Sequence, residues 1–359
     1  MPYIPPTSHV TLLATLRRER LLPLAGDVIA QPRQRVEAAD VVARTFVADR
    51  HHLVDVGRKL GLPDDKADST LVKQDGDLVK QGEPIAVRKT ALGLRKLTAR
   101  SPADGRLVAA AGGKALVAAI SKPFELRAGI PGQVVTILQS RGVVLETTGA
   151  LLEGVWGNGR EDSAPLRLLG DSPTTALTAA LVEMDLRGAL LACGQLADPA
   201  VLKTVAEVHP RGLIVGGLAP GLLAQVQQLD FPVLVVEGFG QRGFSAPAYA
   251  LLKSNAGREA WLNAIVWDRF NGKRPELIVP LPGPSTPPLA PVQGEALAVG
   301  KRVRVLRGRD AGKVGAVLEL GEAPVLIASG LRARVARVML EGGAAGGTAV
   351  PVANLEILE

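Results

Sequence analysis

Residues 302–317 read RVRVLRGRDAGKVGAV, two short alternating runs joined by a turn that contains three glycines. Val303 and Val305 fall on one face of the first run, while Arg302 and Arg304 fall on the other. Glycine tolerates the positive φ that tight hairpin turns require. The pattern therefore predicts an antiparallel β-hairpin with an apolar inner face and basic residues on its outer face and around its turn.

This stretch resembles a KOW motif, found in NusG-type transcription elongation factors and in a large-subunit ribosomal protein. The matching positions are Val303, Val305, Gly308, Gly312, Gly315 and Val317. The resemblance implies a small SH3-like β-barrel over 295–359, with short strands downstream at 324–329, 333–340 and 349–358. We find no counterpart of the amino-terminal polymerase-binding domain of the NusG-type proteins.

In the families that it resembles, the hairpin loop contacts RNA or protein. The predicted contact residues combine glycines that let a backbone approach a phosphate with cations that would pair with it. They are Arg302, Arg304, Arg307, Gly308, Arg309, Gly312, Lys313 and Gly315. The same glycines are also needed to build a barrel, and such barrels can dock proteins, so a protein-docking and a purely structural role remain open.

The region 25–160 has short β-type runs punctuated by glycine. LVKQDGDLVKQGEPIAVRK (71–89) followed by RSPADGRLV (100–108) resembles the barrel-sandwich hybrid fold of biotinyl and lipoyl domains. The lysines between the two halves lack that family's modification contexts, so we expect no biotin or lipoate. A second candidate phosphate-contacting set lies there without an intervening acid, namely Arg88, Lys89, Arg95 and Lys96.

Buried apolar strands alternate with helical patterns from about residue 165 to residue 264. The strands are expected within 188–194, 211–217 and 231–240. Helices are expected after Ser172 over 174–188, within 198–210 with Asp198 as the cap, over 219–230 and around 246–254. This alternation predicts a small Rossmann-like parallel α/β unit with helices on both faces.

Ligands of such units sit at the carboxyl ends of the strands. The candidate anion or ligand residues at those ends are Gly194, Gly216, Gly217 and Glu237. The chain has no Gly-x-Gly-x-x-Gly after the first strand and no P-loop sequence. We therefore predict no nucleotide cofactor, and no cofactor of any other kind.

The sequence thus predicts a multi-domain α/β-plus-β protein. Its expected parts are a partly helical lead-in at 1–24, the β-rich module at 25–160, the α/β unit at 165–264, a β return segment at 265–279, a proline-rich linker at 280–294 and a tethered barrel at 295–359.

The amino-acid composition limits the classes of partner that we expect. A net charge of +7 favours anionic partners, whereas an aromatic content of 3% disfavours a base-stacking surface. The single cysteine, Cys193, excludes an internal disulfide and suits a reducing compartment, and no His/Cys spacing suggests a metal site. Without a signal-type segment or a long apolar run, we expect cytoplasmic residence and no membrane contact.

No combination of acid, base and nucleophile stands out in the sequence. We therefore expect a non-enzymatic binding protein of the transcription or translation machinery that contacts nucleic acid or ribonucleoprotein through basic loops. The alternatives are a scaffold or assembly subunit that binds only protein, and an enzyme with its pocket at the α/β strand ends.

Overall fold

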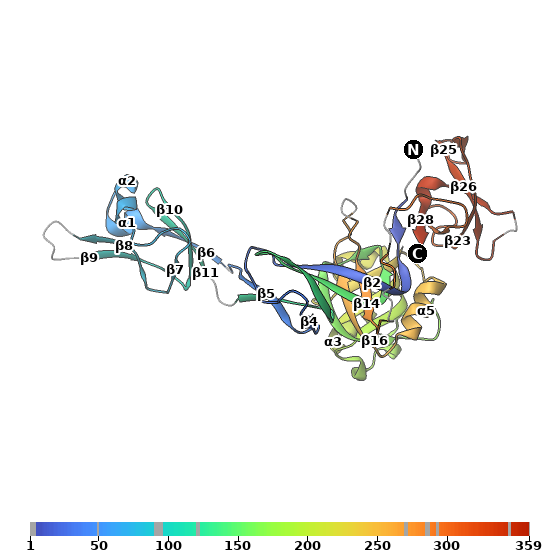
Figure 1. Cartoon of the computed structure of the whole chain (residues 1–359), viewed down its shortest axis with the longest axis horizontal. Coiled ribbons are helices and arrows are strands. Elements are labelled where there is room, and N and C mark those ends of the chain that lie inside the picture. Colours follow the sequence, from blue (N-terminus) through green and yellow to red (C-terminus); the bar gives the residue numbers. More distant parts are fainter. Residues whose placement is uncertain are drawn as a thin grey trace.

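The computed structural model describes residues 5–48, 50–89, 96–119, 123–268, 272–283, 288–291, 294–343 and 346–358. In this part of the chain β-strands predominate, arranged in several sheets with few helices. Figure 1 shows an elongated molecule in which a β unit at one end connects through a second β unit to a larger body, with a further β unit beside the body. We name them the distal unit (50–119), the proximal unit (27–46 and 123–146), the body (147–283) and the C-terminal unit (295–358).

Parallel strands form the centre of the body. They are β16 (Arg160–Leu168), β17 (Leu190–Leu196), β18 (Gly212–Leu218) and β19 (Val233–Phe239). The side chains of α3 (Pro199–Val208) and α4 (Leu223–Gln227) pack on one face of this sheet, and those of α5 (Ala246–Ser254) on the other. Burial on both faces explains why these strands are almost uninterrupted apolar runs.

The sheet continues beyond the parallel strands. β16 also pairs antiparallel with β20 (Glu259–Ala264), which pairs with β21 (Glu276–Pro280). β21 pairs with β14 (Gly142–Glu153), whose other neighbours are β2 (Val10–Leu21) and β13 (Gly132–Leu138). β15 (Trp156–Gly157) pairs with β19 at the other edge. The long strands β2 and β14 therefore run from the proximal unit into the body (Figure 1).

Of the four helices predicted in the α/β unit, two are confirmed, one is shorter than expected and one is wrong. Asp198 caps α3 by accepting a hydrogen bond from the Ala200 amide at 2.8 Å, and α5 lies where it was expected. The segment 174–188 forms only the 3₁₀ turns η2 (Ala179–Leu181) and η3 (Met184–Leu186), because its backbone pairs with Gln195 beside the end of β17. Tertiary pairing here outweighs helix propensity.

The lead-in at 1–24 is not helical where the structure describes it. Its residues form β2, in which buried Ala14 and Leu16 alternate with exposed or half-buried neighbours. That period of two is the signature of a half-buried strand. The expected helix over 219–230 is also shorter than predicted, consisting of η4 (Pro220–Leu222) and α4.

The proximal and distal units repeat one β motif. In the first half of the motif, β3 (Asp27–Val28) corresponds to residue 71, β4 (Arg35–Val36) to β7 (Leu78–Val79), and β5 (Val41–Phe46) to β8 (Pro84–Lys89). In the second half, β12 (Pro123–Arg127) corresponds to β9 (Lys96–Arg100), and β13 to β10 (Gly105–Ala111). The distal unit also contains β6 (Arg50–Asp55), α1 (Val56–Leu60), α2 (Asp64–Ala67), η1 (Asp68–Thr70) and β11 (Lys114–Ala119).

Equivalent hydrogen bonds establish this repeat. The Ile29 amide donates to the Val42 carbonyl at 2.9 Å, and the Val72 amide donates to the Ile85 carbonyl at 2.8 Å, 43 residues later in each case. In the second halves, the pair Gly132–Val36 corresponds to the pair Gly105–Val79. The distal unit is therefore inserted between β5 and β12, at the hairpin position of the proximal unit.

The turn at Gly76 in the distal unit and the equivalent turn at Arg33 in the proximal unit have the same conformation but different residues. Gly76 has φ of 94° and its amide donates to the Leu107 carbonyl at 2.7 Å; the equivalent Arg33 has φ of 64° and its amide donates to the Val134 carbonyl at 2.8 Å. Glycine adopts this left-handed conformation without strain, whereas arginine does so at a cost. Only the distal copy therefore has the glycine signature that was visible in the sequence.

The C-terminal unit is a six-stranded sheet that includes the amino-terminal strand. Its order is β1 (Thr7–Ser8), β28 (Leu355–Leu358), β22 (Arg302–Val305), β23 (Val314–Leu320), β26 (Val335–Leu340) and β27 (Thr348–Pro351). The turn η5 (Val352–Asn354) precedes β28, and β24 (Val325–Leu326) with β25 (Arg332–Ala333) forms a separate hairpin. Because β1 leads into β2, the C-terminal unit is joined to the body by more than the predicted linker.

Candidate binding surfaces

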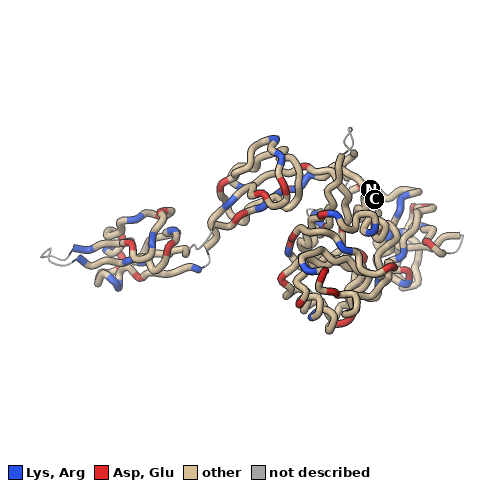
Figure 2. The backbone as a smooth tube through the Cα atoms, turned by 90° about the horizontal axis from the view of Figure 1, so that it is seen from below, with Lys and Arg blue, Asp and Glu red and all other residues tan. Residues whose placement is uncertain are grey.

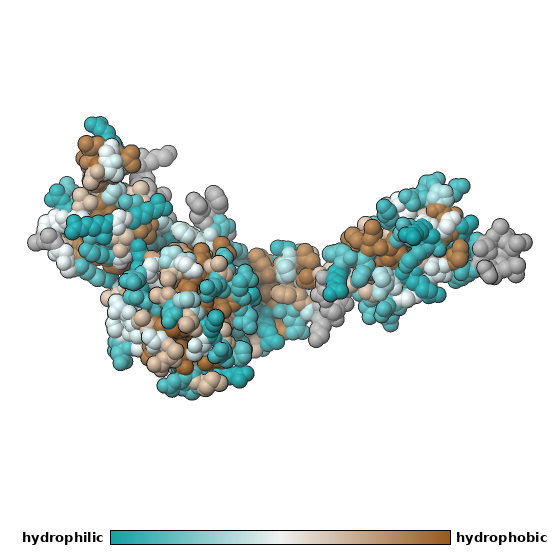
Figure 3. All heavy atoms as spheres, turned by 180° about the vertical axis from the view of Figure 1, so that it is seen from behind, coloured by the Kyte–Doolittle hydropathy of each residue, from teal (hydrophilic) through white to brown (hydrophobic). Residues whose placement is uncertain are grey.

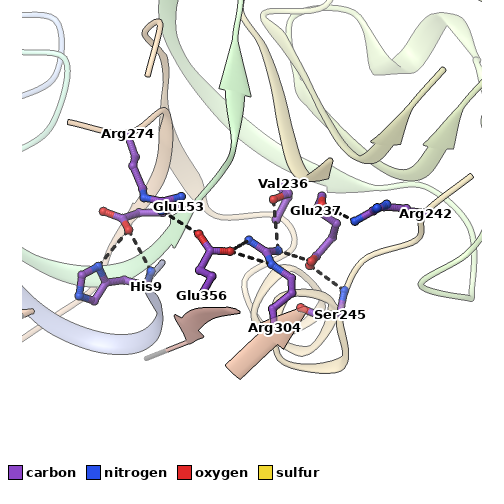
Figure 4. A network of polar contacts seen from close by, with 9 residues as sticks. All are labelled: His9, Glu153, Val236, Glu237, Arg242, Ser245, Arg274, Arg304 and Glu356. Atoms are coloured by element: carbon purple, nitrogen blue, oxygen red, sulfur yellow. Dashed lines mark hydrogen bonds and ion pairs between the residues drawn. The ribbon is translucent and has the colours of Figure 1, made fainter. Parts of the chain in front are cut away.

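Arg304, the central cation of the predicted KOW-like hairpin, lies in a buried ion-pair network between the C-terminal unit and the body (Figure 4). Its Nε and Nη2 donate to Glu356 Oε2 at 2.9 and 2.5 Å, and its Nη1 donates to Glu237 of β19. Arg304 is 2% exposed. Burial lowers the pKa of its guanidinium, but the carboxylates of Glu356 and Glu237 more than offset this and raise it.

The network extends on both sides of Arg304. Glu237 Oε1 accepts the Ser245 amide at 2.8 Å, and Glu356 Oε1 accepts Arg274 Nη2 at 2.7 Å. The Arg274 guanidinium also lies over the Trp267 ring, 4.5 Å from its centroid. The prediction that Arg304 contacts an external phosphate is therefore wrong, because its charge is already neutralised inside the protein and holds two units together.

The other cations of this hairpin divide into paired and unpaired residues. Arg302 Nη2 donates to Glu341 at 2.9 Å, and Lys313 Nζ donates to Asp310 at 2.7 Å; both cations are exposed. Arg307 and Arg309 are exposed, and no ion pair joins either to another residue that the structure describes. Of the five predicted cations, these two retain the full capacity to bind an external anion.

The hairpin glycines also differ in role. A Cβ on Gly315 would lie 2.2 Å from the Met339 carbonyl oxygen of β26, so this glycine permits strand pairing within the unit. A Cβ on Gly312 would lie 3.3 Å from Nη1 of Arg242, which places this side of the turn against the loop after β19. Gly308 has open space at its Cβ position. The open part of the turn is therefore around residues 307–309.

The four residues predicted at the α/β strand ends are covered by the chain itself. A Cβ on Gly194 would lie 2.4 Å from the Pro173 carbonyl oxygen, and one on Gly216 would lie 2.6 Å from the Phe244 amide nitrogen. A Cβ on Gly217 would lie 2.4 Å from the Arg242 carbonyl oxygen, and Glu237 is engaged by Arg304 and Ser245. These glycines permit close packing of the covering loops where a ligand was expected.

Replacing Gly217 with alanine tests this packing role. The new Cβ would overlap the backbone around Arg242, so we expect the free energy of unfolding to fall by about 1–3 kcal/mol. Gly221→Ala is the matched control, because nothing lies within 4 Å of its Cβ position and its φ is not positive. Denaturant titrations of both variants should differ; equal stabilities would contradict the packing role.

Cys193 is fully buried beside the same loops. Its Sγ lies 3.2 Å from the Thr175 carbonyl oxygen, and burial raises the pKa of the thiol. A thiol that ionises less readily is a poor nucleophile. This environment favours a packing role for Cys193.

The second predicted basic set lies at the far end of the distal unit. Lys89 ends β8 and Lys96 begins β9, and both side chains are exposed, as are those of Arg58 and Lys59 on the neighbouring helix α1. Figure 2 shows Lys and Arg on both strands at this end. No ion pair joins these four side chains to another described residue, and Arg95 lies outside the described residues.

Arg88, the remaining member of that set, has a structural role. Its Nη1 donates to the carbonyls of Leu60 and Gly61 at 2.7 and 2.9 Å, at the carboxyl end of α1. A cation at this position interacts favourably with the partial negative charge of the helix end. We name Arg58, Lys59, Lys89 and Lys96 the distal cation cluster.

Net charge is unevenly distributed along the molecule. Residues 50–119 contain thirteen Lys and Arg against eight Asp and Glu, and residues 295–359 contain nine against seven. The rest of the chain has twenty of each. The excess positive charge therefore belongs to the distal unit (+5) and the C-terminal unit (+2), and the KOW-like stretch indicated only the smaller of these two excesses.

Among the described residues, no group of three His, Cys, Asp or Glu is placed to hold a metal ion, and no helix is long and apolar enough to cross a membrane. Comparison with known proteins found no matching family model and no matching curated protein.

Proposed function

We propose that this protein is a non-enzymatic, cytoplasmic binding protein that contacts nucleic acid or ribonucleoprotein of the transcription or translation machinery through the distal cation cluster. The observation that carries the proposal is the concentration of unpaired, exposed cations at the end of a unit with a net charge of +5. Exposed cations bind phosphates with release of counterions, whereas cations already in internal pairs contribute little.

The arrangement of the units supports this assignment. The distal unit extends away from the body (Figure 1), so its end can enter a groove or contact a strand without collision by the larger parts of the molecule. Arg307 and Arg309 would supply a weaker second contact at the C-terminal unit. The β-rich composition of both units is compatible with the barrel-sandwich hybrid and SH3-like folds implied by the sequence, and these finer fold assignments are part of the proposal.

A mobility-shift titration with single-stranded RNA and with duplex DNA tests the proposal. Lys89→Glu/Lys96→Glu should weaken binding on the order of tenfold or more. On duplex DNA it should also reduce the slope of log K against log salt by about 0.9 for each phosphate that the variant no longer neutralises. The matched control is Arg167→Glu/Lys253→Glu, which reverses two exposed cations of the body and gives the same net charge of +3.

The control separates a localised contact from general attraction. If both double variants weaken binding equally, net charge alone is responsible and the distal cation cluster is not the contact. If the wild-type chain binds neither polymer at low salt, the proposal is wrong and the protein-only scaffold is favoured.

A further inference from the structure

The hairpin β24–β25 of the C-terminal unit projects from its sheet. Val325 pairs with Ala333, and the turn is closed by the Ile327 amide, which donates to the Leu331 carbonyl at 2.9 Å. The two strands form a sheet of their own and pair with no other described strand. Figure 1 shows this hairpin at the edge of the molecule, away from the body.

Three large apolar side chains lie exposed on the hairpin. Val325 is 46% exposed, Leu326 is 71% exposed and Leu331 is 67% exposed. We name these three residues the apolar apex. Figure 3 shows hydrophobic residues gathered on this projecting end of the C-terminal unit. Single exposed leucines are common, whereas several large apolar side chains grouped on one protruding turn are typical of an interaction surface.

Arginines follow the apolar apex along the chain. Arg332, Arg334 and Arg337 are all exposed, and we name them the arginine collar. Their internal contacts are weak, consisting of a 3.4 Å hydrogen bond from Arg334 to the Gly321 carbonyl and a 3.9 Å pair between Arg337 and Glu319. Glu322 is the only acidic residue between positions 320 and 340. Arg332 lies opposite Leu326 next to the turn, and Arg334 and Arg337 follow towards the sheet, so the hairpin places its exposed apolar residues directly beside positive charge.

We propose that this hairpin docks the protein on an anionic lipid surface, with the apolar apex in the acyl boundary and the arginine collar at the phosphates. An extended chain rises about 3.3 Å per residue, so Arg334 lies about 10 Å behind Leu331. That separation matches the 5–10 Å by which interfacial elements bury their apolar side chains below the headgroups. Long arginine side chains can also reach back to the headgroups while their stems remain in apolar surroundings.

A convex shape distinguishes this partner from a protein pocket. The apolar apex projects from the C-terminal unit (Figure 1), so its partner must deform around it or supply a hollow. A lipid leaflet deforms, and its negative surface attracts the collar. The expectation of no membrane contact rested on the lack of a long apolar run, and that criterion does not detect a three-residue apex.

Flotation of the full chain with vesicles tests the proposal. We expect binding to phosphatidylcholine vesicles that contain phosphatidylserine, and little binding to phosphatidylcholine alone. Leu326→Asp/Leu331→Asp should lower the affinity about a hundredfold or more, since each leucine buried contributes at least about tenfold. Arg332→Glu/Arg334→Glu should lower it on the order of 25-fold, about fivefold for each arginine.

The control is Leu12→Asp/Leu289→Asp, which makes the same change at leucines that are 64% and 91% exposed elsewhere in the chain. This control variant should bind anionic vesicles like the wild type. Failure of the wild type to float, or undiminished flotation of the apex variant, would overturn the proposal and favour an apolar pocket of a partner protein. Nucleic-acid mobility shifts of the apex variant should remain unchanged, so this proposal can fail independently of the proposed function.

Discussion

Replacing Arg304 with methionine should lower the free energy of unfolding by about 3–5 kcal/mol, because it leaves the buried carboxylate of Glu237 without its cation and that of Glu356 with only Arg274. Glu237 and Glu356 are 5% and 1% exposed, so water cannot replace the lost guanidinium. Methionine approximates the length of the aliphatic stem but provides no hydrogen-bond donors. The C-terminal unit should also separate more readily from the body, since Arg304 links β22 to β19.

Denaturant titration measures the loss of stability, and limited proteolysis of residues 280–294 measures the separation. Arg302→Met is the matched control, because Arg302 lies two residues away and pairs with Glu341 at 2.9 Å on the surface. Exposed pairs of this kind contribute about 0–1 kcal/mol. Arg304→Met/Glu237→Gln should recover part of the loss by neutralising one carboxylate. If Arg302→Met and Arg304→Met have equal stabilities, the buried network does not hold the two units together.

Local sequence rules predicted much of the body correctly. The strands β17, β18 and β19 were visible as uninterrupted apolar runs because both of their faces are buried, and Asp198 followed by proline marked the start of α3. The segment after Ser172 has similar helical signals, yet it pairs with the end of β17. That pairing depends on a distant strand, which no local rule can supply.

Arg304 is a second case in which local sequence rules cannot supply a contact with a distant part of the chain. Alternation correctly placed Val303 and Val305 in the core and Arg304 on the opposite face of β22. The sequence pattern identifies a second face but not what covers it, and here the body covers it. Two glutamates that complete the network are 67 residues before and 52 residues after Arg304, so no spacing motif links them.

The sequence also does not reveal that the distal unit repeats the β motif of the proximal unit. Gly76 and Gly82 mark turns of the distal copy, but Arg33 and Ala39 stand at the equivalent proximal positions. Equivalent hydrogen-bond positions reveal the relation where residue identities do not. The distal cation cluster followed partly from sequence, because Lys89 and Lys96 lie in an acid-free stretch, whereas Arg58 and Lys59 join them only through the packing of α1 beside β9.

A second ion pair, between partly exposed Arg18 and buried Glu276, should show a loss of stability that depends on pH. Arg18 Nε and Nη2 donate to the two carboxylate oxygens of Glu276 at 2.6 and 2.5 Å, and Glu276 is 4% exposed. Burial raises the pKa of the Glu276 carboxyl above its ordinary 4.5, and Arg18 offsets this only in part. Arg18→Met should therefore lower the free energy of unfolding by about 3–5 kcal/mol at neutral pH.

The sign of the pH dependence follows from proton binding. Between pH 4.5 and the raised pKa of Glu276, the folded protein holds a proton that the unfolded chain has released, so the contribution of this group to stability falls as pH rises. Removing Arg18 raises the pKa of Glu276 further and extends that window upward. The cost of Arg18→Met should therefore be largest at neutral pH and shrink towards pH 4.5, where the Glu276 carboxyl is largely protonated in the folded wild type and in the folded variant.

Unfolding free energies of the wild type, Arg18→Met and Arg17→Met across this pH range provide the measurement. Arg17 is the neighbouring residue, pairs with Glu146 at 2.7 Å and has a side chain that is 70% exposed, so its replacement should have a small effect at every pH. Adding Glu276→Gln to Arg18→Met should restore most of the stability at neutral pH and remove the pH dependence of the loss. A constant cost for Arg18→Met from acid to neutral pH would mean that lost packing of the arginine stem, rather than an unpaired buried carboxylate, is the cause.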